Sequence, residues 1–417
     1  MTRHYSALSL LKEGFNNQQG WVKAWENPRP KPRYDIVIIG GGGHGLATAY
    51  YLAKTHGITN VAVIEKGWLG GGNTGRNTTV VRSNYFFPES VRLYDLALKL
   101  YEGLSRELNY NIMLSQRGMI SLAHTPAEME MSARVVNAMQ INGTDAELFG
   151  PEDVRRVLPI YNFGPKARYP ALGGVWQGRS GTARHDAVAW GYARAASQLG
   201  VDIIQQCEVQ DFIIEGGRCR GVVTSHGTIR ADRIGMAVAG HSSQMAAKAG
   251  FRLPIVSYAL QACVSEPVKP ILDTIVLSPG AGTYASQSDK GEMVVGGGLD
   301  RIPSYGQRGN LPVLETVVSG LVEMFPSFRQ LKLMRHWAGI VDVVPDSSPI
   351  IGESPLPGLF LNCGWGTGGF KSIPAGGTLL AHLLATGQHN DISRPFDLDR
   401  FARGRLIDEA AGSGIAH

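Results

Sequence analysis

The sequence predicts an α/β fold of two intertwined domains, one with a parallel-containing sheet and one with an antiparallel sheet. Three observations predict it. A strand, a glycine turn, a helix and a second strand follow one another over residues 34–65; glycine-rich strand ends recur in the middle and near the end of the chain; and blocks with antiparallel strand patterns lie between them. The 417-residue length also exceeds one ordinary domain.

The first unit reads YDIVIIGGGGHGLATAYYLAKTHGITNVAVIE, beginning at Tyr34. Residues 35–39 form the β-branched run of a buried parallel strand, and residues 61–64 form the next strand. We expect a helix over about residues 45–55, with Gly57 placed to end it.

The turn between the first strand and the helix carries the pattern G-x-G-x-x-G, at Gly40, Gly42 and Gly45. Its glycines permit a tight turn, the approach of backbone to a pyrophosphate, and close packing of helix on strand. The helix aims its first N–H groups at that pyrophosphate, and backbone at His44 lies within reach of it. Glu65 follows the second strand, where a carboxylate can accept the hydroxyls of an adenosine ribose. The unit therefore predicts a bound dinucleotide.

Composition limits the other classes of function. Lys plus Arg exceed Asp plus Glu by only 40 − 35 = 5, and no basic run interleaves with aromatic residues, so nucleic acid is not expected as a partner. The four cysteines are far apart and predict no metal site and no disulfide framework, a pattern that suits the cytoplasm. No apolar run approaches membrane-spanning length, and the N-terminus lacks the apolar core of a signal peptide.

Further elements follow in order. Residues 1–32 are expected to form an arm, whose Leu8, Leu10 and Leu11 dock on this subunit or on a neighbour. In the middle of the chain we expect a helix over residues 186–199 and strands at 201–209, 212–214, 221–224, 228–232 and 234–239, with a Gly216-Gly217 turn. Near the end, a strand over residues 359–363 precedes the glycine loop 364–369 and a helix from about Pro374.

Because nucleotide-domain features recur in three places, we expect one discontinuous nucleotide-binding domain, formed by residues 33–125, 176–250 and 331–417. Residues 126–175 and 251–330 would form a second, substrate-binding domain, with strand patterns at 261–265 and 292–298.

Two of the glycine-rich segments favour FAD over a nicotinamide cofactor. A second glycine run, residues 70–72, leads into the small and hydroxylated residues 73–78, which can wrap a longer cofactor. The loop 364–369 offers backbone N–H groups near a flavin ring, where negative charge develops on reduction. The candidate FAD-binding residues are Gly40, Gly42, Gly43, His44, Gly45, Glu65, Asn73, Thr78, Val80, Val209, Gly366, Thr367 and Gly369.

From about Trp25 onward the sequence resembles the amine-oxidising FAD enzymes of the D-amino acid oxidase and glycine oxidase type, which have a glutathione reductase-like, Rossmann-like FAD domain. More specifically, it resembles the β subunits of heterotetrameric sarcosine oxidases. Besides the first unit, the segments GNTGRNTTVVRSNY, ARHDAVAW, WAGIVDVVPDSSPII and NCGWGTGGFK carry the resemblance. It implies noncovalent FAD, a covalently attached FMN, and partner subunits of the α, γ and δ type.

His185 is the residue to which the resemblance assigns the covalent FMN, through the flavin 8α-carbon. That chemistry needs a neutral imidazole nitrogen as nucleophile, with cations such as Arg184 nearby. From the residues alone, His185 equally reads as part of a helix start capped by Thr182 or Asp186.

Arg82 and Lys371 are the candidate catalytic residues. The resemblance places Arg82 against the substrate carboxylate, for which a planar guanidinium is suited. It places Lys371 near flavin and substrate, where the lysine could also serve FMN. The alternatives are an arginine ending a surface strand and a lysine at a helix start, although a cation is unfavourable there.

Other polar and aromatic residues receive weaker assignments. We assign Arg335 to the FMN phosphate, with an exposed strand arginine as the alternative. Asp342 and Asp346 are expected to make turn and backbone hydrogen bonds, and the side chain of His44 is expected to be incidental. A structural role is expected for His241, and core positions for Tyr50, Tyr51, Trp190 and Tyr192.

The implied reaction is the oxidation of sarcosine to glycine and formaldehyde, or to a methylene-folate formed on a partner subunit. FAD takes a hydride from the N-methyl carbon and passes electrons to FMN, and oxygen becomes hydrogen peroxide. The alternatives are a dehydrogenase of the dimethylglycine or proline type, and a flavin-holding subunit whose partner performs the catalysis.

Overall fold

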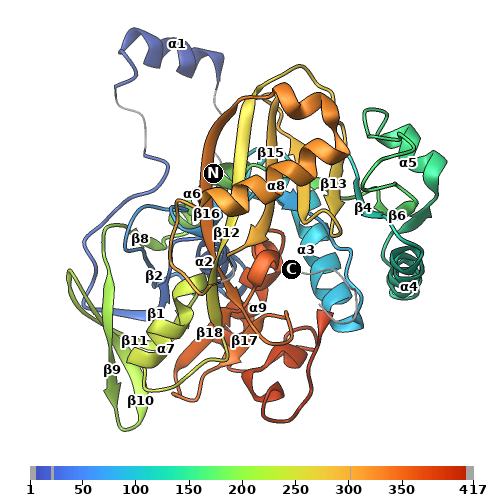
Figure 1. Cartoon of the computed structure of the whole chain (residues 1–417). Coiled ribbons are helices and arrows are strands. Elements are labelled where there is room, and N and C mark those ends of the chain that lie inside the picture. Colours follow the sequence, from blue (N-terminus) through green and yellow to red (C-terminus); the bar gives the residue numbers. More distant parts are fainter. Residues whose placement is uncertain (1–5, 20–22, 301, 410–417) are drawn as a thin grey trace.

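Two eight-stranded sheets form the body of the protein (Figure 1). The computed structural model describes residues 6–19, 23–300 and 302–409. The predicted α/β class is confirmed, and the two sheets are built from segments that alternate along the chain.

The first sheet has the strand order β17-β18-β11-β1-β2-β8, with β9 and β10 extending from β11. The neighbours of β1 and the pairs β2–β8 and β11–β18 are parallel. The strands are β1 (Arg33–Ile39), β2 (Val61–Ile64), β8 (Asp202–Ile204), β9 (Val209–Glu215), β10 (Arg218–Thr224), β11 (Gly227–Met236), β17 (Ile350–Glu353) and β18 (Leu359–Cys363).

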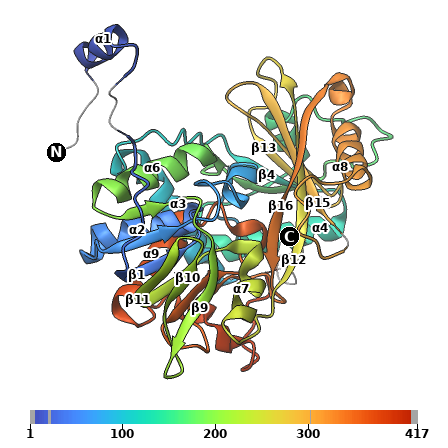
Figure 2. The same cartoon turned by 90° about the vertical axis from the view of Figure 1, so that its left-hand side faces the viewer.

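Alternate residues of β1 serve the two faces of this sheet. Ile36 and Ile38 pack with α2 (Gly43–His56), α3 (Pro88–Glu107), α6 (His185–Gln198) and α9 (Ile373–Thr386). Val37 and Ile39 pack on the other side with β9, β10 and the short helix α7 (Ser242–Lys248). The β9–β10–β11 meander and α7 lie together in Figure 2. Both faces of β1 are therefore buried, as its continuous apolar run predicts.

The first strand–helix–strand unit is confirmed with small shifts at its ends. The helix begins at Gly43 and ends at Gly57, which has the left-handed φ of +67°. Strand β8 stops at Ile204, so residues 201–209 are not one strand. The two predicted strands 228–232 and 234–239 are one strand, β11, which ends at Met236.

The second sheet has the order β16-β12-β15-β14-β13-β4-β6-β5. All pairs are antiparallel except β4–β13. The strands are β4 (Met119–Ala123), β5 (Glu147–Phe149), β6 (Gly173–Gln177), β12 (Val256–Pro267), β13 (Ile275–Ser278), β14 (Thr283–Gln287), β15 (Glu292–Leu299) and β16 (Leu333–Val343). Helices α4 (Pro126–Ile141), α5 (Pro151–Val157) and α8 (Leu311–Met324) pack beside it.

Two of these strands come from ranges predicted for the nucleotide-binding domain. Strand β4 lies within residues 33–125 and β16 within 331–417, yet both pair in the second sheet. A separate two-stranded ribbon pairs β3 (Val80–Val81) with β7 (Gly181–Thr182). In the chain, β3 follows the glycine run 70–72, and β7 comes just before α6.

Helix α1 (Ala7–Phe15) buries none of its residues, and Leu8 is 78% exposed, so this helix does not dock on its own chain (Figure 2). Docking on a neighbouring subunit stays a prediction. The core position predicted for Trp190 is wrong. Trp190 is 42% exposed, whereas Tyr50, Tyr51 and Tyr192 are buried as predicted. Trp190 follows the buried Val188 and Ala189 on α6, at a position that faces away from the sheet.

The four cysteines are free and buried. In the part of the chain that the structure describes, no cluster of side chains has the composition of a metal site, and no helix is long and apolar enough to cross a membrane.

Candidate active site

A cavity of about 940 Å³ is lined by residues of both sheets. Twelve of the thirteen candidate FAD-binding residues line it, including Val80 and Val209. The exception is Gly45, which lies beneath: a Cβ there would come within 1.9 Å of the Gly40 carbonyl oxygen. Gly45 therefore permits the close packing of α2 on β1, the role predicted for the third glycine.

At one end of the cavity, backbone N–H groups converge on the start of α2. Gly40 has a φ of +108°, and a Cβ there would meet the Ala237 carbonyl oxygen at 2.4 Å. Helix α2 has no side-chain cap, and its Gly43 N–H donates to the Thr74 hydroxyl at 3.0 Å. This cradle of glycine backbone at an uncapped helix N-terminus fits a pyrophosphate.

Glu65 is tied to the same cradle. Its two carboxylate oxygens accept N–H groups of Gly41 and Gly67, each at 2.8 Å. These bonds fix the carboxylate at the cavity wall and leave it lone pairs for further donors, such as ribose hydroxyls.

Side chains also tie separate segments of the cavity wall together. Asn73 exchanges hydrogen bonds with the backbone of Ile340 on β16, accepting its N–H at 2.9 Å. The His44 Nε2 lies 2.8 Å from the Gly369 carbonyl oxygen, and its ring packs on Trp365. The side chain of His44 is therefore not incidental, because it joins α2 to the C-terminal glycine loop. Burial lowers the pKa of His44 to about 4, so the ring is neutral at physiological pH.

Asp342 anchors the glycine loop from the second sheet. Its buried carboxylate accepts the Gly364 N–H at 2.6 Å, while Gly366, Thr367 and Gly369 line the cavity. Burial raises the pKa of Asp342 to about 6, against the opposing effect of backbone N–H groups. The predicted turn and backbone role is confirmed for Asp342. It is confirmed also for Asp346, which accepts the N–H of Ile407 at 3.2 Å and pairs with Arg400.

Two buried cations, Arg82 and Lys371, lie on the cavity wall. Arg82 is 8% exposed and Lys371 is 5% exposed, and neither forms an ion pair with any described residue. The Lys371 ammonium donates instead to the Thr367 carbonyl oxygen at 3.1 Å and to the Tyr85 hydroxyl at 3.4 Å. Burial, and then the charge of Arg82, lower the pKa of Lys371 far below its usual range.

Uncompensated buried cations are costly, so their presence in a cavity indicates an anionic ligand. The alternative of a surface arginine is wrong for Arg82, which is buried. Lys371 does lie at a helix start, two residues before α9, but its side chain is buried and lines the cavity.

Tyr284, on β14 of the second sheet, also lines this cavity, and sequence reasoning missed it. The Thr78 hydroxyl donates to its phenol oxygen at 3.0 Å. Thr78 itself was predicted, but 206 residues separate the pair and no motif signals Tyr284.

His185 is the first residue of α6, and it does not line the cavity. Its Nδ1 is buried and has no hydrogen-bond partner among the described residues. Burial lowers the pKa of His185, an effect that Asp186 opposes and Arg184 reinforces. No side chain caps α6, so the capping alternative is wrong, although Asp186 accepts the Ala187 N–H at 2.8 Å. A neutral, unpartnered imidazole nitrogen fits the nucleophile that covalent flavin attachment requires.

Of the other predicted FMN residues, Arg184 and Arg335 do not line the cavity. The Arg184 guanidinium pairs with the Asp186 carboxylate at 3.0 Å. Arg335 lies on the edge strand β16 with an exposed side chain that bonds to no described residue. Only Lys371, of the four, lines the cavity. His241 also lines it, stacked on Tyr305 and bonded to Gln244.

Comparison with known proteins agrees with this arrangement. A family model described as FAD dependent oxidoreductase matches residues 35–383. "Sarcosine oxidase subunit beta" of Rhodobacter capsulatus is 51% identical over 416 residues, with all of both chains covered, and that of an Arthrobacter species is 52% identical over 94% of this chain and 97% of its own. The chain belongs to the FAD-dependent oxidoreductases and, among them, to the sarcosine oxidase β subunits.

Solved structures of other proteins share the fold. L-proline dehydrogenase from P. horikoshii is 27% identical, with a TM-score of 0.85 over 90% of this chain and 100% of its own. Glycine oxidase from Geobacillus kaustophilus, 23% identical, gives 0.79 over 89% and 99%. The resemblance stated from the motifs is thereby confirmed.

Proposed function

We propose that this chain is the sarcosine-oxidising subunit of a hetero-oligomer, converting sarcosine to glycine and formaldehyde. The single observation that carries the proposal is the pair of buried cations, Arg82 and Lys371, without anionic partners on the cavity wall. A small amino acid supplies one carboxylate for both. The relatives named sarcosine oxidase subunit beta support sarcosine as that amino acid and the presence of other subunits. We propose the α, γ and δ types that the sequence resemblance implies.

The side chains bind and orient the substrate. The Arg82 guanidinium and the Lys371 ammonium hold the carboxylate, which fixes the N-methyl group relative to the cavity wall. The substrate ammonium must lose a proton to solvent before its N-methyl carbon is oxidised, and the positive charges of Arg82 and Lys371 favour that loss.

Bound FAD, cradled by the glycine segments, supplies the hydride acceptor, and an FMN attached at His185 would supply a second redox centre at which oxygen gives hydrogen peroxide. The unpartnered Nδ1 of His185 supports that attachment. Arg184 and the exposed Arg335 are the cations available to the FMN, and a partner subunit would cover Arg335. Where a folate on a partner captures the one-carbon unit, methylene-folate replaces formaldehyde.

The test of the substrate assignment uses the complex purified with its partner subunits. Sarcosine added in air should give one hydrogen peroxide per glycine in the absence of a folate. Arg82→Met should weaken the apparent affinity for sarcosine by about 10–100-fold, the loss expected for a charge-assisted hydrogen bond. Unchanged reduction of FAD by sarcosine in this variant would contradict the assignment and would favour a flavin-holding subunit.

The covalent FMN has an independent test. After denaturation the chain should remain yellow and heavier by one FMN, and His185→Ala should give colourless chain of unmodified mass. Colourless wild-type chain would contradict the attachment while leaving the FAD site untouched.

A dehydrogenase of the proline or dimethylglycine type is the second candidate, because a proline dehydrogenase shares the fold at 27% identity. Proline or dimethylglycine would then reduce the FAD faster than sarcosine does, with little peroxide formed in air.

A further inference from the structure

We propose that Asn84 and Gln177 are positioning residues that hold the Arg82 guanidinium in the cavity as an unneutralised cation. This inference rests on the proposed function, in which Arg82 binds the substrate carboxylate. Neither residue lines the cavity, so each acts through Arg82 rather than on the substrate.

Asn84 holds the guanidinium with a neutral group. The Arg82 Nη1 donates to the Asn84 Oδ1 at 2.6 Å and to the Asn84 carbonyl oxygen at 3.3 Å. The Asn84 side chain is 2% exposed, and its Nδ2 has no partner among the described residues. An aspartate of the same shape would satisfy Arg82 and would also cancel its charge. The amide fixes the guanidinium and leaves its charge for a ligand.

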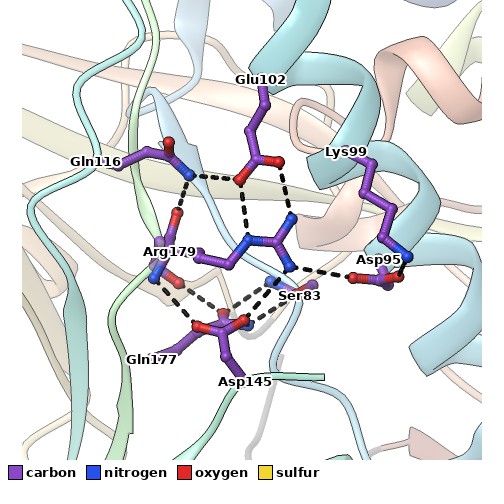
Figure 3. Close-up of polar contacts among 9 residues, drawn as sticks. Ser83, Asp95, Lys99, Glu102, Gln116, Asp145, Gln177 and Arg179 are labelled. Atoms are coloured by element: carbon purple, nitrogen blue, oxygen red, sulfur yellow. Dashed lines mark hydrogen bonds and ion pairs between the residues drawn. The ribbon is translucent and has the colours of Figure 1, made fainter. Parts of the chain in front are cut away.

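Gln177, at the end of β6, fixes the backbone of Ser83, which lies between Arg82 and Asn84. Its Oε1 accepts the Ser83 N–H at 3.0 Å, and its Nε2 donates to the Ser83 hydroxyl at 2.7 Å. The Ser180 hydroxyl donates to the same Oε1 at 2.6 Å, and Gln177 is 1% exposed. A side chain of the second sheet thus clamps the segment that carries Arg82, as Figure 3 shows at Ser83.

The neighbouring carboxylates are committed elsewhere. Arg179 binds Glu102 through two nitrogens, at 2.9 and 2.8 Å, and lies 3.5 Å from Asp95 and 3.6 Å from Asp145 (Figure 3). Gln177 Nε2 contacts this cluster at Asp145 Oδ1, 3.4 Å away.

Glu409 is the remaining acid whose charge interacts with Arg82, and its oxygens accept the N–H groups of Phe86 and Phe87 at 3.0 and 2.9 Å. The Arg179 guanidinium and the backbone N–H groups before α3 therefore hold these acids. Arg82 is held by the Asn84 amide.

The experiment measures ligand binding in the full complex loaded with FAD. The probe is methoxyacetate, which keeps the carboxylate of sarcosine but replaces its amine by an ether oxygen, and methoxyacetamide is its neutral counterpart. Flavin absorbance reports binding. Asn84→Asp should weaken methoxyacetate binding by about 10–100-fold and leave methoxyacetamide binding within about twofold. Asn84→Ala, which keeps the charge of Arg82 available, should weaken methoxyacetate binding by a smaller factor than Asn84→Asp does.

A merely structural role predicts equal effects on the charged and neutral probes, and that result would overturn the inference. The inference would also be overturned if Asn84→Asp bound methoxyacetate with wild-type affinity while Arg82→Met no longer bound it. If Arg82→Met itself binds methoxyacetate normally, the proposed function fails instead. Should Asn84→Asp not retain FAD, Gln177→Leu replaces it. That variant should bind methoxyacetate about tenfold more weakly at normal FAD content, and wild-type affinity would overturn the inference.

Discussion

At the scale of single residues, the cavity is defined by charges that the fold leaves uncompensated. Arg82 and Lys371 come from segments 289 residues apart, yet the charge of one lowers the pKa of the other. Burying these charges without an anionic partner destabilises the ligand-free protein, and binding of an anion removes this destabilisation. The pair therefore links ligand binding to pH.

Replacing Lys371 by methionine should stabilise the ligand-free protein at neutral pH by about 1–3 kcal/mol, because a buried polar group is removed. The folded pKa of Lys371 lies below its unfolded value, so the unfolded state binds more protons between the two and stability rises with pH through that range. Lys371→Met should flatten this rise. Urea unfolding at two pH values measures it, and unchanged slopes would contradict the lowered pKa.

The motif residues of the cavity were predictable because each has a local reason to occur. Gly40 permits the tight turn after β1, and Gly45 permits the close packing of α2 on β1. Arg82 and Lys371 lie within short sequence motifs of the family. Asn84 and Tyr284 were not predicted. Tyr284 contacts Thr78, 206 residues away, and only the fold brings the two together. Asn84 lies two residues from Arg82, but nothing in the sequence shows that both side chains are buried and bonded to each other.

At the scale of elements, the decisive contact is that of α2 on β1, which sets where the helix N-terminus meets the cavity. Gly45→Ala should destabilise the protein by about 3 kcal/mol and weaken FAD retention, because its Cβ would overlap the Gly40 carbonyl. Gly103, exposed in the interior of α3 with no atom within 4 Å of an added Cβ, is the matched control.

Gly103→Ala should leave FAD retention unchanged and raise stability by about 0.5–1 kcal/mol, the difference in helix propensity. Thermal unfolding and flavin content measure both variants. Equal behaviour of the two alanines would mean that the close approach at Gly45 is unimportant.

Helices and strands with a strong local sequence pattern were predicted well. Which of the two sheets a strand joins was not. Strand β11 was expected as two segments, 228–232 and 234–239, but it is continuous through Arg233, whose guanidinium reaches the Leu384 carbonyl oxygen. Strand β16 pairs along its length with β12, and nothing in its own sequence distinguishes one sheet from the other. Trp190 was misplaced because an aromatic residue in a helix was assumed to be core.

At the scale of the whole molecule, the C-terminal segment is joined to the body by a buried ion pair. Arg400 binds Asp346 through two nitrogens, at 2.7 and 2.9 Å, and donates to the Ser348 carbonyl oxygen at 2.6 Å. Arg400→Met should cost about 3–5 kcal/mol of unfolding free energy, because Asp346 is left as a buried, unpaired charge.

The exposed pair of Arg403 with Asp399, 3.2 Å apart, provides the control for this substitution. Arg403→Ala should change stability by less than about 1 kcal/mol. Denaturant unfolding compares the two variants, and a small loss in Arg400→Met would show that the segment contributes little to the cooperative fold.

The order of strands in the first sheet also governs when the protein becomes complete during synthesis. Strand β1 is made early, but its neighbour β11 comes about two hundred residues later, and β18, on the far side of β11, comes later still. A nascent chain therefore carries the apolar strand β1 unpaired on one edge until β11 has been made. The glycine loop and Lys371 are made after β18, so a closed cofactor site cannot form before that last segment is synthesised.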